Sequence, residues 1–241
     1  MPRPIATISP ELAAILGTPD SLRAANVNAE LVYPAAAQQG VSYRRVGKRV
    51  LELALILLAL PVVLPVIALV AILVACDGHR PFYVQKRVGE GGRNFDMLKL
   101  RTMVPNAAAN LDAYLRANPE AAAEWAADQK LKNDPRVTRI GHFLRKTSLD
   151  ELPQLFNVLN GTMSLVGPRP MMPCQKDSYG GSAYYRLKPG ITGLWQISDR
   201  NECEFSGRAS YDELYDRVLS LRLDVAILIR TVGVVLRGTG Y

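Results

Sequence analysis

Residues 53–75 read LALILLALPVVLPVIALVAILVA, 23 residues without a charged or strongly polar side chain. At about 1.5 Å of rise per residue, a helix of this length covers the hydrocarbon core of a bilayer, which is roughly 30 Å thick. The stretch begins too far along the chain to be a cleaved signal peptide. We therefore expect residues 43–76 to form a membrane element that the protein retains.

Two prolines and two basic flanks leave the topology of this element open. Pro61 and Pro65 each remove a backbone hydrogen bond and clash with the preceding turn, so we expect a kink or a break there. One interpretation is an ordinary kinked transmembrane helix. The other is a re-entrant helix that enters, bends and returns, because a single crossing would move one of two basic clusters away from the cytoplasm. The clusters are Arg44, Arg45, Lys48 and Arg49 before the stretch, and Arg80, Lys86, Arg87 and Arg93 after it.

The composition limits what kind of protein this chain can be. It carries 29 lysines and arginines against 22 acidic residues, a net charge of +7, and is 49% hydrophobic. A disordered polyelectrolyte is excluded, because there is ample apolar surface to bury. Three cysteines without a CxxC pair and only 2 histidines argue against a disulfide framework, a structural zinc site and a histidine-based triad. The basic excess suits nucleic acid, anionic lipid or a phosphorylated substrate.

The chain divides into three segments by composition. Residues 1–42, rich in Ala, Pro, Asn and Ser without sustained periodicity, are expected to form a mobile leader. The membrane element follows, and residues 77–241 are long enough for one soluble domain with a single core. In that domain we expect a hairpin with strands PFYVQKRVG and RNFDMLKLRTM, joined by residues 90–93. A helical region over residues 106–132 should be interrupted at Pro119.

Asp150 and Glu151 are the most informative residues. Ser148 and Glu151 have capping-box spacing, and apolar residues at helical intervals continue to Asn160, which predicts a helix with both acids in its first turn, distorted by Pro153. One interpretation is that the acids only favour the helix dipole. The other is an anion site, where a carboxylate attacks phosphorus once arginines or a divalent cation neutralise the charge. The basic residues nearby are Arg136, Arg139, Arg145, Lys146 and Arg169.

Three later motifs admit two interpretations each. GPRP at residues 167–170 is a rigid turn that presents Arg169 either to a ligand or only to solvent. In LKPGITGLWQISDRN, residues 187–201, an exposed Trp195 with Gln196 would stack on and hydrogen-bond a nucleobase, whereas an isolated Trp is more often a core residue. The last segment, residues 211–237, suits either a helix in the lipid headgroup region or a core helix.

Together these motifs resemble those of a known family, the bacterial sugar transferases or monotopic phosphoglycosyl transferases. The resemblance covers residues 43–241 and includes the apolar stretch with its two prolines. Its motifs are KRVLE at 48–52, FDMLKLRTM at 95–103, LRKTSLDELPQLFNVLNGTMSLVGPRP at 144–170, PGITGLWQISDRN at 189–201 and LDVAILIRTV at 223–232. The chain looks like the short undecaprenyl-phosphate galactose or glucose phosphotransferases that initiate exopolysaccharide synthesis.

The resemblance implies a role for each matching residue. Asp150 would be the nucleophile and Glu151 its partner, and the two acids would help to hold Mg²⁺ as the cofactor. Asp150 would attack the sugar-bearing phosphorus of a UDP-sugar and release UMP, and undecaprenyl phosphate would then attack the phosphosugar left on the enzyme. The implied phosphate-binding residues are Arg145, Arg169, Lys99 and Arg101, and the implied nucleotide-binding residues are Gln196 and Arg200.

The resemblance also implies an architecture and a location. The expected fold is α+β and mostly helical, with a re-entrant N-terminal helix broken at Pro61 and Pro65, a small cytoplasmic catalytic domain and interfacial amphipathic helices. Such a protein is monotopic and lies on the cytoplasmic face of the bacterial inner membrane. Glu52 departs from the family, which usually has Asp there, so the geometry of a pairing between this acid and a basic partner is in doubt.

The expected partners are a UDP-sugar, undecaprenyl phosphate and membrane lipids. Nucleic acid is not expected, because the chain carries no zinc-finger or RNP-like motif. A membrane-anchored scaffold that binds polysaccharide-assembly proteins is the alternative to an enzyme, and a homo-oligomer is compatible with the sequence.

Overall fold

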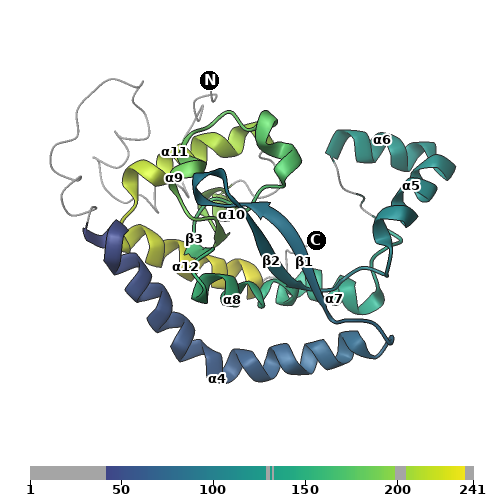
Figure 1. Ribbon diagram of the computed structural model, residues 1–241, viewed down its shortest axis with the longest axis horizontal. Coiled ribbons are helices and arrows are strands. Elements are labelled where there is room, and N and C mark those ends of the chain that lie inside the picture. The colour runs from purple at the N-terminus through teal and green to yellow at the C-terminus, as the bar shows by residue number, and fades with distance from the viewer. Residues whose placement is uncertain (1–41, 129–130, 132, 199–204, 237–241) are drawn as a thin grey trace.

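The computed structural model describes residues 42–128, 131, 133–198 and 205–236. Apart from Ser42, the expected leader lies outside these residues. The described chain is mostly helical with two small sheets, which confirms the α+β class, and Figure 1 shows α4 along one side with most other elements above it. The helices are α4 (Lys48–Ala75), α5 (Ala107–Ala117), α6 (Pro119–Asp128), α7 (Arg139–Thr147), α8 (Gln154–Leu159), α9 (Ala183–Arg186), α10 (Leu194–Ser198), α11 (Arg208–Val218) and α12 (Leu221–Leu236). The strands are β1 (Phe82–Val88), β2 (Asn94–Leu100), β3 (Ser164–Val166) and β4 (Gly190–Thr192).

Helix α4, together with the helical turn before it, is long and apolar enough to cross a membrane over Tyr43–Ala75. Only 22% of its most apolar window is buried, unlike the core helix of a soluble protein. Pro61 and Pro65 lie inside α4, which is continuous, and Figure 1 shows it change direction near its middle. A proline removes one backbone hydrogen bond while the neighbouring turns keep theirs. The helix therefore bends near its middle and is not broken, as Figure 1 shows. A return to the side of entry stays a prediction.

A cluster of polar side chains fixes the start of α4 to the rest of the protein. The Lys48 ammonium lies 2.7 Å from the Asp224 carboxylate of α12 and donates to the Tyr215 hydroxyl of α11 at 2.9 Å. Asp224 also accepts hydrogen bonds from Tyr43 at 2.8 Å and from Tyr215 at 2.6 Å. We call these four residues, with Glu52, the anchor cluster. It joins segments that lie far apart in the sequence.

Glu52, the departure from the family pattern, is a fully engaged member of the anchor cluster. Its side chain is 4% exposed and its Oε1 lies 3.4 Å from the Lys48 ammonium, so the expected basic partner is present. The same oxygen accepts hydrogen bonds from the Ser164 hydroxyl and from the Leu165 amide, the latter at 3.0 Å. Glutamate therefore reaches from α4 to the first residues of β3.

Strands β1 and β2 form the predicted antiparallel hairpin, in which Phe82 pairs with Leu100 and Val88 with Asn94. The connection is the short turn Glu90–Gly92, where Gly91 has φ +67°, a conformation that favours glycine. Residues directly opposite each other share a face of the hairpin, and this face repeats every second residue. Arg87, Met97 and Lys99 therefore lie on the same face.

The second sheet pairs β3 with β4 in parallel and brings two glycine-containing turns into contact. A Cβ on Gly190 would lie 2.1 Å from the amide nitrogen of Gly167, so only glycine allows this approach. The approach sets the GPRP turn, residues 167–170, beside the start of β4. Around this sheet, α10, α11 and α12 form the largest core cluster, which includes Trp195, Tyr215 and Ile227.

The remaining helices agree in part with expectation. Helices α5 and α6 are separated at Asn118, directly before Pro119, as predicted, and Figure 1 shows them projecting from the domain. In α12, Leu223 and Ile227 are buried, whereas Ile229 is 67% exposed. The last helix therefore has both a core face and an exposed apolar face, and its position at a membrane interface stays a prediction.

Candidate active site

The segment that carries Asp150 and Glu151 is not the single helix that the spacing predicts. Helix α7 ends at Ser148, whose backbone is left-handed with φ +57° and whose amide donates to the carbonyl of Arg145. The acids lie in the short 3₁₀ turn Leu149–Glu151, and α8 begins only after Pro153. The predicted capping box is therefore wrong, because the Ser148 side chain makes no capping hydrogen bond and the left-handed backbone of this residue ends α7.

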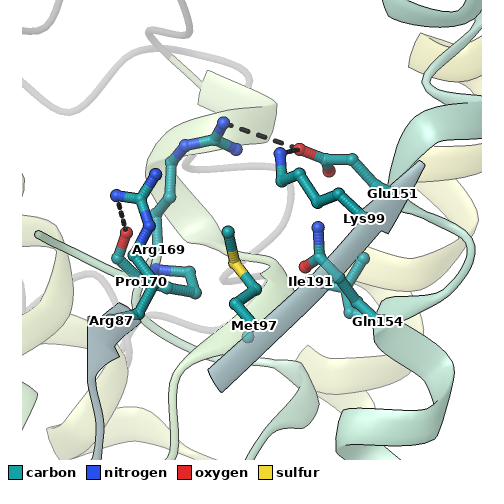
Figure 2. Close-up of a pocket in the computed structure, with 9 residues that line it drawn as sticks. Arg87, Met97, Lys99, Glu151, Gln154, Arg169, Pro170 and Ile191 are labelled. Carbon is teal, nitrogen blue, oxygen red and sulfur yellow. Dashed lines mark hydrogen bonds and ion pairs between the residues drawn. The ribbon is translucent and has the colours of Figure 1, made fainter. Parts of the chain in front are cut away.

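The two acids differ in exposure but share a lysine. Asp150 is 8% exposed, and its Oδ2 lies 3.9 Å from the Lys99 ammonium. Glu151 Oε1 lies 2.9 Å from the same ammonium and 3.6 Å from the Arg169 guanidinium. Figure 2 shows Lys99 and Arg169 pointing toward Glu151 from different elements. The structure thus brings together four residues predicted for the site, from β2, the 3₁₀ turn and the GPRP turn.

Burial and neighbouring charges act in opposite directions on Asp150. Burial raises the pKa of this carboxyl above its ordinary value; Lys99 opposes the rise, Glu151 adds to it, and Arg145 opposes it. Arg145 is itself held in place, since its Nε donates to the Thr102 hydroxyl at 3.0 Å. Burial lowers the pKa of Arg145, and Asp150 counters this effect. Lys99 and Arg145 therefore favour the ionised form of Asp150, against the effect of burial.

A small basic cavity lies on one side of Glu151 (Figure 2). Its volume is about 20 Å³, so a phosphate would rest at its mouth, where the Arg169 side chain is 40% exposed. Three cationic side chains line the cavity: Arg87 from β1, Lys99 from β2 and Arg169 from the GPRP turn. The lining residues are Arg87, Met97, Lys99, Glu151, Gln154, Arg169, Pro170, Gly190 and Ile191.

Sequence reasoning missed Arg87 and Gln154 as members of this cavity. Arg87 donates to the carbonyl of Pro170 at 3.1 Å, which ties β1 to the GPRP turn. Burial lowers the pKa of Arg87 to about 10, and the nearby charge of Arg169 contributes. The hairpin register contains the signal that could have identified Arg87, because it places this residue on the same face as Lys99. No comparable signal marks Gln154, which is 2% exposed.

Arg101, implied as a phosphate-binding residue, lies at a different place in the structure. Its guanidinium donates to Asp77 at 2.6 Å and to the carbonyl of Val74 at 3.1 Å. The hydrogen bond from Arg101 lowers the pKa of Asp77 to about 2. Among the described residues, Arg101 thus ties β2 to the end of α4, and a role toward phosphate stays a prediction.

A second cavity, which we call the apolar groove, lies on the other side of Glu151. It has a volume of about 200 Å³ and runs between the 3₁₀ turn, β4 with α10, and the end of α12. Gln196 lines it, while Arg200 lies outside the described residues. Trp195 is 5% exposed and packs in the core, so the exposed stacking residue that we considered is not found. The groove is lined by Thr147, Ser148, Leu149, Glu151, Leu152, Leu155, Ile191, Thr192, Gln196, Ile197, Thr231, Val234 and Val235.

The donor chemistry of the two acids fits Mg²⁺. This ion is usually held by one or two carboxylates together with substrate phosphates and water, rather than by a complete protein cage. Glu151 lines the basic cavity, and Asp150 is its neighbour in the chain, with a carboxylate 3.9 Å from the same Lys99 ammonium. Among the described residues, no group of three or more His, Cys, Asp or Glu side chains is arranged to hold a metal.

These observations define a class of protein. A domain is attached to a long apolar helix and carries an acid pair, of which Glu151 lines both a basic cavity and an apolar groove. Residues 43–238 match the bacterial sugar transferase family, and the chain belongs to it.

Three curated relatives illustrate the similarity. The "UDP-galactose-lipid carrier transferase" of Erwinia amylovora is 49% identical over 195 residues, 80% of this chain and 41% of that protein. The "undecaprenyl-phosphate galactose phosphotransferase" of Salmonella typhimurium is 45% identical over 195 residues, again 80% of this chain and 41% of the relative. The "exopolysaccharide production protein ExoY" of Rhizobium meliloti is 44% identical over 187 residues, 77% of this chain and 81% of that protein. The chain thus spans about two fifths of the first two relatives.

Proposed function

We propose that this chain transfers a sugar 1-phosphate from a UDP-sugar to undecaprenyl phosphate, releases UMP, and thereby carries out the first membrane step of exopolysaccharide synthesis. The names of three relatives support the proposed donor, acceptor and pathway. They refer to a UDP-galactose-lipid carrier, to undecaprenyl phosphate and to exopolysaccharide production. The long apolar helix supports a reaction at a membrane surface, where a water-soluble donor and a lipid acceptor can meet.

In the proposed first step, an Asp150 carboxylate oxygen attacks the sugar-bearing phosphorus of the donor. A bond forms from this oxygen to phosphorus, and the bond from phosphorus to the bridging oxygen breaks, so that UMP leaves with that oxygen. Lys99 and Arg169 neutralise phosphate charge that would otherwise repel the carboxylate. When bound by Asp150 and Glu151, Mg²⁺ would supply further neutralisation.

In the proposed second step, an oxygen of undecaprenyl phosphate attacks the phosphorus held by Asp150. The bond from phosphorus to the carboxylate oxygen breaks, which restores the free carboxylate and leaves a lipid diphosphate sugar. One phosphoanhydride replaces another, so no further nucleotide is needed. The pairing of a buried carboxylate with Lys99, beside an exposed Arg169, is the observation that carries this mechanism.

The proposal is tested by exchange of labelled UMP into a UDP-sugar without lipid acceptor. The wild type should catalyse this exchange with at least one sugar of a panel of UDP-sugars, and Asp150→Asn should lower the rate at least about 1,000-fold, because the amide cannot form the covalent link. Asp96→Asn, the same substitution at a 61% exposed carboxylate of β2, is the matched control. Exchange at the wild-type rate by Asp150→Asn would refute the assignment of Asp150 as the nucleophile.

We further propose that α4 is re-entrant and holds the domain on the cytoplasmic face of the bacterial inner membrane. The bend at Pro61 and Pro65 and the basic residues on both flanks support this topology. Single cysteines at Ser42 and Glu90, introduced after the native cysteines are replaced by alanine, should both react with an impermeant reagent only from the cytoplasmic side. Reaction of either one from outside would support a spanning helix.

A further inference from the structure

The apolar groove differs from the basic cavity in the chemistry of its walls. Of the described residues that line it, only Glu151 is charged, and most of the others are Leu, Ile or Val. Its two innermost hydroxyls are bonded to each other, since Thr192 and Thr231 lie 2.7 Å apart, and Thr231 also donates to the carbonyl of Ile227 at 2.8 Å. Such walls suit hydrocarbon and do not suit a diphosphate.

The groove and the basic cavity meet at two shared residues, Glu151 and Ile191. A ligand with a phosphate head and an apolar body could therefore place its head beside Lys99 and Arg169 and its body in the groove. Nucleotides lack an apolar body of this kind, whereas a polyprenyl phosphate has one.

The flanks of the groove are also apolar. One wall is α12, where Val235 lines the groove and is 39% exposed, and where Ile229 and Val232 are exposed at 67% and 59%. The opposite wall is the 3₁₀ turn, whose Leu149 packs against a core cluster that contains Val70 and Val74 of α4. A lipid chain that leaves the groove thus remains next to apolar surface.

We infer that the apolar groove binds the phosphate-proximal part of the polyprenyl chain of the acceptor. The inference rests on the proposed function and adds to it the path of the lipid. A volume of about 200 Å³ equals that of roughly seven molecules of liquid water, so only the first part of a long chain fits and the rest lies outside. The competing occupant is the nucleobase, because the Gln196 Oε1 is buried without a hydrogen-bond partner among the described residues.

A pair of tryptophan substitutions on α12 separates these occupants. Val235→Trp places bulk in the groove, and Val232→Trp places the same bulk on the exposed surface of the same helix. With a long-chain polyprenyl phosphate, Val235→Trp should raise the acceptor KM about tenfold relative to Val232→Trp, since burial of a few methylene groups is lost. Its effect on UMP exchange without lipid should be no larger than that of Val232→Trp.

Each other outcome has a defined meaning. An acceptor KM equal in the two variants would overturn the inference, and a selective loss of UMP exchange in Val235→Trp would assign the groove to the nucleotide instead. If the wild type catalyses no exchange, the proposed covalent mechanism fails, and the groove is then tested by direct binding. In that case a fluorescent polyprenyl phosphate should bind more weakly to Val235→Trp than to Val232→Trp in detergent-solubilised full chain, and equal binding would refute the groove.

Discussion

The anchor cluster and the acid pair are both built from carboxylates and cations, but they are paired differently. In the anchor cluster, the Asp224 and Lys48 side chains are 2% and 13% exposed, and they meet at 2.7 Å. At the acid pair, Lys99 lies 2.9 Å from Glu151 but 3.9 Å from Asp150, and the 40% exposed Arg169 lies 3.6 Å from Glu151.

The difference follows from what each cluster has to do. A buried charge is costly unless its partner is close and hydrogen-bonded, so a cluster that only joins elements is closed. A site that receives phosphate must keep cations at a surface where an incoming anion can reach them. The Asp224 carboxylate thus has a cation close by, whereas the Asp150 carboxylate is paired less closely, as expected if this site receives phosphate.

The largest effect on stability is expected from breaking the anchor cluster. Asp224→Asn should lower the free energy of unfolding by about 3–5 kcal/mol, because the buried Lys48 ammonium loses its nearest carboxylate and keeps only Glu52 at 3.4 Å. Thermal unfolding of the detergent-solubilised full chain measures the change. Asp96→Asn, which breaks an exposed pair with Lys86, should cost about 0.5 kcal/mol or less. Equal losses in the two variants would contradict the comparison.

Arg169 should show the opposite behaviour, with a large effect on activity and a small one on stability. Arg169→Ala should slow UMP exchange about 10–100-fold, as expected for loss of a charge-assisted hydrogen bond to phosphate. Its free energy of unfolding should change by about 0.5 kcal/mol or less, because the side chain is 40% exposed. Arg169→Lys keeps the positive charge but loses the bidentate hydrogen bonding of the guanidinium, so it should recover part of the rate. If Arg169→Ala instead lowers the free energy of unfolding enough to explain the slower exchange, Arg169 has a structural role like that of the anchor cluster.

Asp212 sharpens the comparison, because this carboxyl of α11 is buried and accepts a hydrogen bond from the Tyr179 hydroxyl at 2.7 Å. Burial raises its pKa to about 7. An unfolded aspartate titrates near about 3.9, so the stability contributed by the protonated form is complete below about pH 4 and is lost as the pH rises through about 7.

Asp212→Asn should therefore flatten the dependence of stability on pH over this window. The amide is neutral at every pH, so at pH 8 the variant should be more stable than the wild type by about 4 kcal/mol. Unfolding followed at several pH values measures this difference. Parallel curves for the two proteins would show that Asp212 is ionised in the folded state throughout.

Local patterns allowed much of the fold to be predicted. Alternating residues around Gly91 and Gly92 identified the hairpin, and the apolar stretch with Pro61 and Pro65 identified a long, bent helix. The acids and Arg169 were found from sequence because charged residues cluster around them, and Lys99 was implied by the resemblance to a known family.

The errors have physical causes that no local pattern contains. The capping-box spacing of Ser148 and Glu151 was overridden by the left-handed backbone at Ser148. Arg101 shares a face with Lys99, but the end of α4 lies against it, a contact set by the tertiary fold. The anchor cluster joins Lys48 to Asp224 across most of the chain, and such pairings are not readable from one sequence.

The acid pair, which follows the left-handed residue Ser148, and the far walls of the apolar groove come from different parts of the chain. Residues 139–161 carry the acids on one continuous stretch, whose C-terminal helix α8 is held from outside by Arg49 through the carbonyls of Val158 and Leu159. The opposite walls of the groove belong to β4, α10 and α12, which come later in the chain. Changes in the later segment can therefore alter the groove walls without changing the stretch that carries Asp150 and Glu151. A chimera that carries the later segment of a relative should inherit that relative's substrate preference.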